Sequence, residues 1–120
     1  NWEAAMFAHR YGLNNLIGFV DRNRLQICGN TEEVMSLDPL PEKFRAFGWN
    51  VIIIDGHNIR QIIDACDKAA RSKKNPTVII MNTIKGKGVS FMENNVDFHG
   101  RSCKPDEYAK AVEELKAVIQ

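Results

Sequence analysis

Two loops of this sequence carry the side chains best suited to chemistry, and the first lies in NLIGFVDRNRLQICG, residues 15–29. Here an apolar segment runs into Asp21 and Asn23 and the loop closes at a glycine. A carboxamide oxygen and a main-chain carbonyl two residues apart suit Mg²⁺ or Ca²⁺, and Mg²⁺ in proteins usually also binds phosphate. Asn23 and the Leu25 carbonyl are therefore candidate ligands for a metal that binds a diphosphate. An Asx turn ending the strand is the alternative, and it is favoured on spacing alone because D-x-N is common.

The second loop, residues 84–104, contains His99 in FHG and the sequence KGKG at residues 85–88. A histidine there can donate to a diphosphate or exchange a proton with a substrate oxygen near neutral pH. A surface imidazole is the alternative. KGKG lacks the spacing of a P-loop and of a dinucleotide-binding fingerprint. It is predicted to form a flexible turn before a short helix, with phosphate contact as the less favoured interpretation.

Three short apolar runs, residues 16–20, 51–54 and 77–81, predict the strands that position these loops. Their apolar residues are continuous rather than alternating, which is typical of parallel strands covered on both faces. Helical segments lie between them, so the fold class is α/β, with a parallel sheet sandwiched by helices. Both loops follow strands and should emerge at the carboxyl edge of the sheet, where ligands bind in open α/β folds.

Helix boundaries are also encoded locally. A helix over residues 2–11 should stop at Gly12, and one over 41–47 has Pro near its start and Gly just past its end. Another helix should begin with Pro105 in its first turn. Asn58 is predicted to cap a further helix. The apolar face of that helix is predicted to carry Ile59, Ile62, Ile63, Cys66 and Ala70.

Composition excludes several classes of function. The 120 residues suit a single domain, 44% are hydrophobic, and the formal charge of +1 gives no field for nucleic acid or an anionic membrane. Three scattered cysteines without CxxC spacing indicate reduced thiols in a cytoplasmic protein. No apolar stretch approaches the ~18 residues of a membrane span, and we expect no signal peptide. The first residue is not Met and helix-forming residues follow at once, so we expect the natural chain to begin further upstream.

Three longer segments together resemble one enzyme family. They are WEAAMFA with LNNLIGFVDRNRLQICGNTEEV, then PLPEKFRAFGWNVIIIDGHN, then PTVIIMNTIKGKGVSFMENNVDFHG. This combination resembles transketolase, above all the N-terminal, diphosphate-binding subunit of the two-gene transketolases of bacteria and archaea. The resemblance implies thiamine diphosphate held through Mg²⁺ or Ca²⁺ and two-carbon ketol transfer between sugar phosphates (EC 2.2.1.1, pentose phosphate pathway). It also implies a partner, either a pyrimidine-binding domain or a C-terminal subunit, in a homodimer or heterotetramer.

The same resemblance assigns roles to individual residues. Asn23 matches the side-chain metal ligand and Leu25 the backbone-carbonyl ligand. His99 matches the histidine that reaches the diphosphate and the reacting substrate oxygens. The remaining matches are Asp21 beside the cofactor, Ile27 against the thiazolium, and Glu3 in a carboxylate network that links two active sites across a dimer.

The chain departs from the family pattern at several points. The G-D-G half of the metal motif should precede Trp2 by about a dozen residues and is absent, so residues 1–120 are predicted to be one N-terminally incomplete domain, inactive alone. Arg24 stands where many relatives have Gly, and it would perturb the loop if that backbone needs a positive φ. Cys28 stands where Asp is frequent, and Phe98 where Trp is frequent.

Other functions stay open on the sequence. Deoxyxylulose phosphate synthase and related thiamine diphosphate enzymes share the cofactor and the D-x-N metal-binding pattern. The segments WEAAMFA, TEEV and FHG of this chain favour transketolase. From a different class, the chain could be a non-catalytic α/β binding or assembly remnant. A G-D-G upstream of Asn1 in the complete gene would support the enzyme.

Overall fold

The structure, a computed structural model that describes residues 1–119, divides the chain into two units. Unit 1 consists of Asn1–Arg22 and Leu37–Thr83. Unit 2 consists of Asn23–Ser36 and the chain from Ile84 onward. Unit 2 therefore contains most of both loops that were predicted to carry function, together with the C-terminal helix. The single domain over residues 1–120 stays a prediction.

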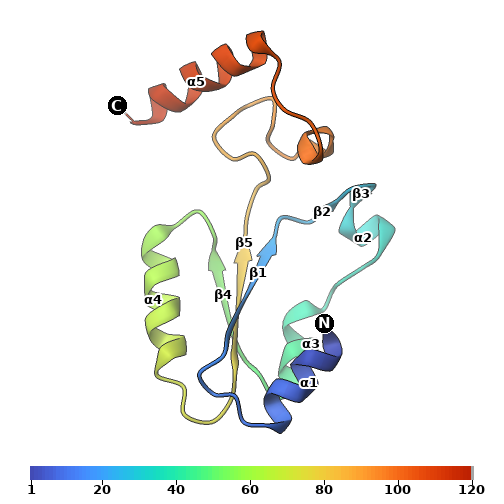
Figure 1. Cartoon of the computed structure of the whole chain (residues 1–120), viewed down its shortest axis with the longest axis vertical. Coiled ribbons are helices and arrows are strands. Elements are labelled where there is room, and N and C mark those ends of the chain that lie inside the picture. Colours follow the sequence, from blue (N-terminus) through green and yellow to red (C-terminus); the bar gives the residue numbers. More distant parts are fainter. Residues whose placement is uncertain (120) are drawn as a thin grey trace. The chain divides into compact units, whose positions relative to one another are not determined.

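A three-stranded parallel sheet forms the centre of unit 1 (Figure 1). Its strands are β1 (Ile17–Arg22), β4 (Asn50–Asp55) and β5 (Thr77–Asn82), in the order β1-β5-β4. The first residues of β1 and β4 both lie opposite Thr77, so the three strands run in one register. All three strands coincide with the predicted apolar runs to within a few residues. The central strand is the most apolar because it has a neighbour on each side and a covered surface on each face.

Helices cover both faces of this sheet. The helices α1 (Trp2–Arg10) and α3 (Leu40–Ala46) lie on one face, and α4 (Ile59–Ala70) lies on the other (Figure 1). Successive β5 residues alternate between the two sides, as the two-residue period of a strand requires. The predicted α/β fold with a parallel sheet between helices is thereby confirmed.

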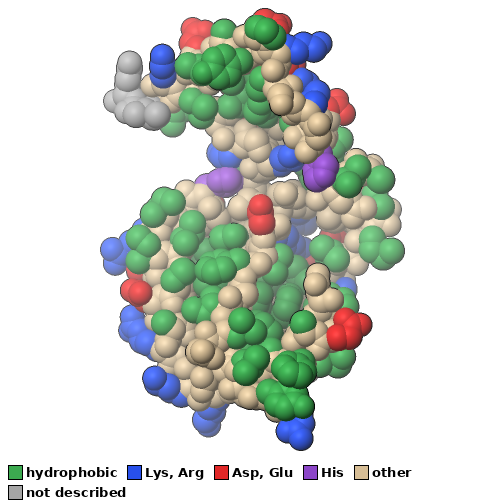
Figure 2. All heavy atoms as spheres, viewed as in Figure 1, with side chains coloured by type: hydrophobic (Ala, Val, Ile, Leu, Met, Phe, Trp, Pro, Cys, Tyr) green, Lys and Arg blue, Asp and Glu red, His purple; other side chains and the backbone are tan. Residues whose placement is uncertain are grey.

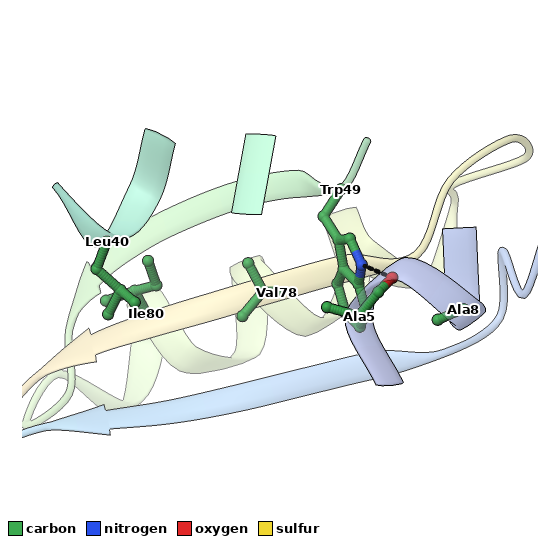
Figure 3. Close-up of a cluster of buried hydrophobic side chains, with 6 residues drawn as sticks. All are labelled: Ala5, Ala8, Leu40, Trp49, Val78 and Ile80. Atoms are coloured by element: carbon green, nitrogen blue, oxygen red, sulfur yellow. Dashed lines mark hydrogen bonds between the residues drawn. The ribbon is translucent and has the colours of Figure 1, made fainter. Parts of the chain in front are cut away.

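The core beneath α1 depends on a buried indole as well as on aliphatic side chains. Val78 and Ile80 of β5 pack with Leu40 and with the alanines of α1 (Figure 3). Trp49 closes this cluster and donates from Nε1 to the carbonyl oxygen of Ala5 at 2.9 Å. A buried indole N–H needs such a partner, so the bond fixes α1 on the sheet without leaving an unpaired donor.

The helix boundaries follow the predicted local signals, but the buried face of α4 is narrower than predicted. Asn58 caps α4, its side-chain oxygen accepting from the Gln61 N–H at 3.1 Å. The side chains of α4 that pack on the sheet come from Ile62, Ala65, Cys66 and Ala69. Ile59, Ile63 and Ala70 were predicted on the same apolar face, yet all three are exposed, Ile59 by 68% and Ile63 by 51%. They flank the stripe that meets the sheet, because one helix face contacts a flat surface through only about a third of its circumference.

Unit 2 is built mostly from turns and short elements. It contains β2 (Leu25–Gln26) and β3 (Gly29–Asn30), which form a hairpin, and α2 (Thr31–Val34) directly after them. The 3₁₀-helix η1 (Val96–His99) and the helix α5 (Pro105–Ile119) complete it. KGKG lies in consecutive turns, as predicted, and the short helix that follows it is the 3₁₀-helix η1, which begins after further turns.

The surface shows no dominance of one charge sign. Acidic, basic and hydrophobic side chains are interspersed over the face shown in Figure 2. Across residues 1–119, no helix has the length and apolar character that crossing a bilayer would require. The three cysteines, Cys28, Cys66 and Cys103, are free thiols.

Candidate functional site

The loop after β1 forms a tight turn around the predicted metal ligands. The side-chain oxygen of Asn23 accepts a hydrogen bond from the Leu25 N–H at 2.9 Å. This bond makes an Asx turn, so the local geometry offered as the alternative is present. The turn does not exclude a metal, because a carboxamide oxygen has two lone pairs and the N–H uses one of them. Arg24, between the two residues, has a positive φ of 62°.

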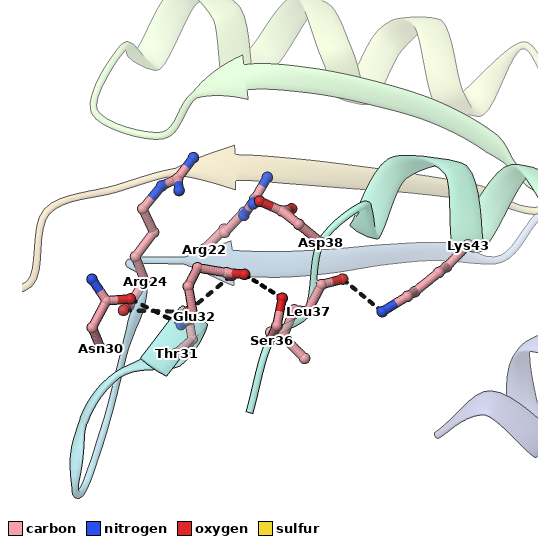
Figure 4. A network of polar contacts seen from close by, with 9 residues as sticks. All are labelled: Arg22, Arg24, Asn30, Thr31, Glu32, Ser36, Leu37, Asp38 and Lys43. Carbon is pink, nitrogen blue, oxygen red and sulfur yellow. Dashed lines mark hydrogen bonds and ion pairs between the residues drawn. The ribbon is translucent and has the colours of Figure 1, made fainter. Parts of the chain in front are cut away.

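The hairpin that follows orients the Leu25 carbonyl. The Thr31 N–H donates to the Arg24 carbonyl oxygen at 2.9 Å, and the Thr31 hydroxyl donates to the same oxygen at 3.3 Å (Figure 4). The main-chain bond makes Arg24 and Thr31 a hydrogen-bonded pair of the hairpin. Along two antiparallel strands, opposite residues alternate between hydrogen-bonded and non-hydrogen-bonded pairs, so the next pair, Leu25 with Asn30, is not hydrogen-bonded. In such a pair the N–H and C=O point away from the partner strand. The Leu25 N–H bonds to Asn23, and we therefore expect the Leu25 carbonyl on that same edge.

A small pocket in unit 2 brings the two predicted loops together. Its volume is about 40 Å³, which is enough for a metal ion or a water, since a cavity of ~10–15 Å³ already holds one water. A diphosphate would have to extend beyond it. The pocket is lined by Asn23, Leu25, Gln26, Lys85, Val96 and His99. Both predicted metal ligands and the predicted histidine therefore meet at one place.

Lys85 is the pocket residue that the sequence interpretation underrated. Its Nζ lies 3.4 Å from the Phe98 carbonyl oxygen, and its own carbonyl accepts from the Asn94 N–H at 3.0 Å. The chain can turn directly after it because Gly86 has a φ of +72°, and a Cβ there would lie 2.5 Å from the Met92 carbonyl oxygen. The sequence signals were its place in KGKG, where phosphate contact was the less favoured interpretation, and its position after a buried strand at the carboxyl edge where ligands bind.

His99 is the last residue of η1. Asn95 caps this short helix, its side-chain oxygen accepting from the Asp97 N–H at 3.0 Å. The imidazole is exposed to solvent at the pocket rim, so it is accessible to a ligand. A lysine and a histidine on one rim give a site that attracts an anion.

The donor set fits a hard divalent cation only in part. Asn23 and Leu25 supply neutral oxygens, which Mg²⁺ and Ca²⁺ accept. Within residues 1–119, no group of three His, Cys, Asp or Glu side chains is placed to hold a metal. A metal here would have to complete its coordination with phosphate oxygens, water or groups outside these residues, which is the usual situation for Mg²⁺.

The other predicted site residues do not line the pocket. Asp21 lies at the end of β1 in unit 1, where it accepts a hydrogen bond from the Thr83 hydroxyl and so ties β1 to the residue after β5. Ile27 lies in the turn of the β2–β3 hairpin and is 70% exposed. Glu3 lies in the first turn of α1 and is also exposed. Their predicted roles stay predictions.

A parallel sheet between helices defines the class as an α/β protein, and the loops that follow β1 and β5 line the small pocket of unit 2. The family follows from the sequence comparisons. The family model for the thiamine diphosphate binding domain of transketolase matches residues 1–117. The chain belongs to the transketolase family.

Several relatives show how much of a transketolase the chain represents. It is 47% identical over 115 residues to the 6-deoxy-6-sulfo-D-fructose transketolase subunit of a Clostridium species, covering 96% of this chain and 42% of that protein. It is 41% identical over 119 residues to an apulose-4-phosphate transketolase subunit of Phocaeicola vulgatus, covering 99% and 42%. The chain thus spans about two fifths of the length of these relatives.

A solved structure agrees with the fold described above. The transketolase from Campylobacter jejuni superposes with a TM-score of 0.89 at 30% identity, covering 96% of this chain and 18% of that one. The resemblance to transketolase that the sequence motifs indicated is therefore confirmed for nearly the whole chain.

Proposed function

We propose that this chain anchors the diphosphate end of thiamine diphosphate in a transketolase. The reaction is the transfer of a two-carbon ketol unit from a ketose phosphate to an aldose phosphate. The observation that carries the proposal is the meeting of Asn23 and Leu25 with Lys85 and His99 around one pocket. Two loops far apart in the sequence thereby supply metal-binding oxygens on one side and cationic or proton-donating groups on the other.

Each residue has a distinct role in this proposal. The Asn23 side-chain oxygen and the Leu25 carbonyl hold Mg²⁺ or Ca²⁺, and the metal offsets the negative charge of the diphosphate. Lys85 and His99 bind phosphate oxygens, and His99 also donates a hydrogen bond to the reacting oxygen of the sugar. When bound, thiamine diphosphate supplies the electron sink for breaking a carbon–carbon bond. The protein residues position it and neutralise its charge.

The rest of the active site lies outside these residues in our proposal. A G-D-G segment upstream would supply an aspartate ligand, and a pyrimidine-binding domain or C-terminal subunit would cover the other half of the cofactor. The complete assembly is a homodimer or heterotetramer in the cytoplasm, in which Glu3 joins the carboxylate network between active sites. Asp21 lies beside the cofactor and Ile27 against its thiazolium. The 120 residues alone are expected to be inactive.

The substrate is a ketose with an anionic group at its far end. Relatives named for 6-deoxy-6-sulfo-D-fructose and for apulose 4-phosphate support this class, since both names carry such a group. EC 2.2.1.1, in the pentose phosphate pathway, is one reaction within it. Assays with ribose 5-phosphate as acceptor and ketose phosphates or a sulfonated ketose as donors would distinguish these reactions.

Calorimetric titration tests the anchoring role directly. The complete protein with its partner is titrated with thiamine diphosphate, with Mg²⁺ and again in excess EDTA. We expect binding with Mg²⁺ and at least a ~10-fold loss of affinity without it, because metal affinity and ligand binding are coupled. Affinity that is the same in EDTA would contradict a metal-bridged diphosphate. No binding in either condition would favour a non-catalytic remnant.

A further inference from the structure

The orientation of His99 needs an explanation beyond its own helix. It ends a 3₁₀-helix of four residues, and a single turn of this kind is held by few and poorly aligned hydrogen bonds. The Asn95 cap fixes only the start of η1. After His99 comes Gly100, which has no side chain to pack. The support for the imidazole must therefore come from the neighbouring side chains.

Phe98, directly before His99, is held on two sides. The guanidinium carbon of Arg101 lies 3.8 Å from the centroid of the Phe98 ring, well within cation–π range. The Phe91 ring lies 5.6 Å from it, centroid to centroid, in a tilted arrangement typical of aromatic pairs. With the ring fixed and its carbonyl near Lys85, Phe98 has little freedom to rotate. The backbone that carries His99 is constrained with it.

Arg101 is in turn fixed by helix α5. Its two terminal nitrogens donate to the two carboxylate oxygens of Glu107 at 2.7 and 2.9 Å. Glu107 also accepts from the Lys104 N–H at 2.9 Å, which ties its carboxylate to the start of α5. A two-point contact sets the plane of the guanidinium as well as its position. The pKa of Glu107 is lowered to about 2, chiefly by the hydrogen bond from Arg101, in agreement with this geometry.

We propose that Arg101 is a positioning residue, which clamps Phe98 against Phe91 and thereby holds His99 at the rim of the diphosphate pocket. The proposal rests on the proposed function, because it assumes that His99 contacts the anion. Arg101 itself does not line the pocket with Asn23 and Lys85. Its effect on anion binding should therefore pass through His99.

A double-mutant cycle tests this route. Binding of inorganic pyrophosphate with Mg²⁺ is measured by calorimetry in the complete protein for the wild type, Arg101→Gln, His99→Ala and the double variant. We expect a ~3–30-fold loss of affinity for Arg101→Gln, which lies within the range of coupling between interacting residues. In the His99→Ala background the same change should cost less than twofold. Arg101→Lys should restore little, because an ammonium keeps the charge but lacks the planar fork.

The outcomes separate positioning from simpler roles. An equal loss in both backgrounds would overturn the proposal, and with full recovery in Arg101→Lys it would show that Arg101 attracts the anion directly. An unchanged affinity in Arg101→Gln would also overturn it. If His99→Ala alone binds pyrophosphate normally, the assignment of His99 in the proposed function fails and the positioning role falls with it.

Controls exclude a general loss of structure. Arg45 pairs with Glu42 through a single contact of 2.6 Å in unit 1, so Arg45→Gln removes an arginine–glutamate pair outside the pocket and should leave pyrophosphate affinity unchanged. If Arg101→Gln does not fold, Glu107→Gln replaces it. That variant keeps an oxygen for the Lys104 N–H and removes the charge that orients Arg101. It should show the same dependence on His99, and equal losses in both backgrounds would again overturn the proposal.

Discussion

The side-chain oxygen of Asn23 and the main-chain nitrogen of Leu25 are joined by a hydrogen bond of 2.9 Å. The two residues predicted to bind one metal are therefore already held in a fixed relation by the chain itself. The turn and the metal site are not competing explanations of D-x-N. The turn fixes the loop, and the second lone pair of the same oxygen stays available for the metal ligation that we propose.

Replacing Asn23 separates the metal from the turn. Asn23→Ala removes both the ligand and the acceptor, and we expect the affinity for thiamine diphosphate with Mg²⁺ to fall ~100-fold or more. Asn23→Asp keeps an acceptor for the Leu25 N–H and an oxygen for the metal, so it should retain most of the affinity. Calorimetry on both variants, with melting curves, measures the difference. Equal affinity in Asn23→Ala and the wild type would remove this residue from the metal site.

Arg24 should make the protein less stable than glycine would. Its φ of 62° is unfavourable for any residue with a Cβ, and the cost of ~1–2 kcal/mol exceeds the ~0.5–1 kcal/mol of entropy that glycine loses on folding. We therefore expect Arg24→Gly to stabilise the fold by ~0.5–1 kcal/mol. Lys74→Gly is the matched control at an exposed residue without a positive φ, and it should not stabilise. Denaturant titration measures the free energy of unfolding of both variants. The prediction is wrong if Arg24→Gly is less stable than the wild type while Lys74→Gly is more stable.

Gly86 is expected to be intolerant of any side chain. A Cβ would lie 2.5 Å from the Met92 carbonyl oxygen, and the φ of +72° adds strain. Gly86→Ala should cost ~2–4 kcal/mol, as overpacking and an unfavourable backbone conformation combine. Lys85 directly precedes Gly86 and lines the pocket, so a distorted turn should displace Lys85 and lower the affinity for pyrophosphate as well. Gly100→Ala is the control, since a Cβ there meets nothing within 4 Å. Similar melting temperatures for the two variants would contradict the close approach.

The sequence predicted the sheet better than the site. The uninterrupted apolar run at Val78–Ile80 indicates a strand buried on both faces, because burial alone determines that pattern. The β2–β3 hairpin has strands of two residues each, too short to give any periodicity. The meeting of Lys85 with Asn23 is a tertiary contact between separate loops, and local sequence carries no signal for it. Motif resemblance supplied Asn23 and His99, whereas Lys85 was known only as part of KGKG until the structure placed it beside them.

The ion pair of Glu107 with Arg101 should make stability depend on pH in the acidic range. Arg101 donates to the carboxylate, and with the Lys104 N–H it lowers the pKa of Glu107 from 4.5 to about 2 in the folded state. Asp97, Cys103 and Lys104 are the other titratable groups that act on this pair. The pKa is lower in the folded state, so ionised Glu107 stabilises the fold above about pH 4.5, and this contribution is lost as the pH falls towards 2.

Melting temperatures of the wild type and Glu107→Gln from pH 7 to pH 2 measure this contribution. The wild type should melt higher near neutral pH, and the two curves should converge as the carboxylate becomes protonated. When Arg101→Gln is present as well, the melting temperatures with Glu107 and with Glu107→Gln should differ less with pH. The reason is that this substitution removes the main group that lowers the pKa of Glu107. A gap between the wild type and Glu107→Gln that stays constant down to pH 2 would mean that the pair contributes packing alone. The clamp on Phe98 would then depend on shape and not on charge.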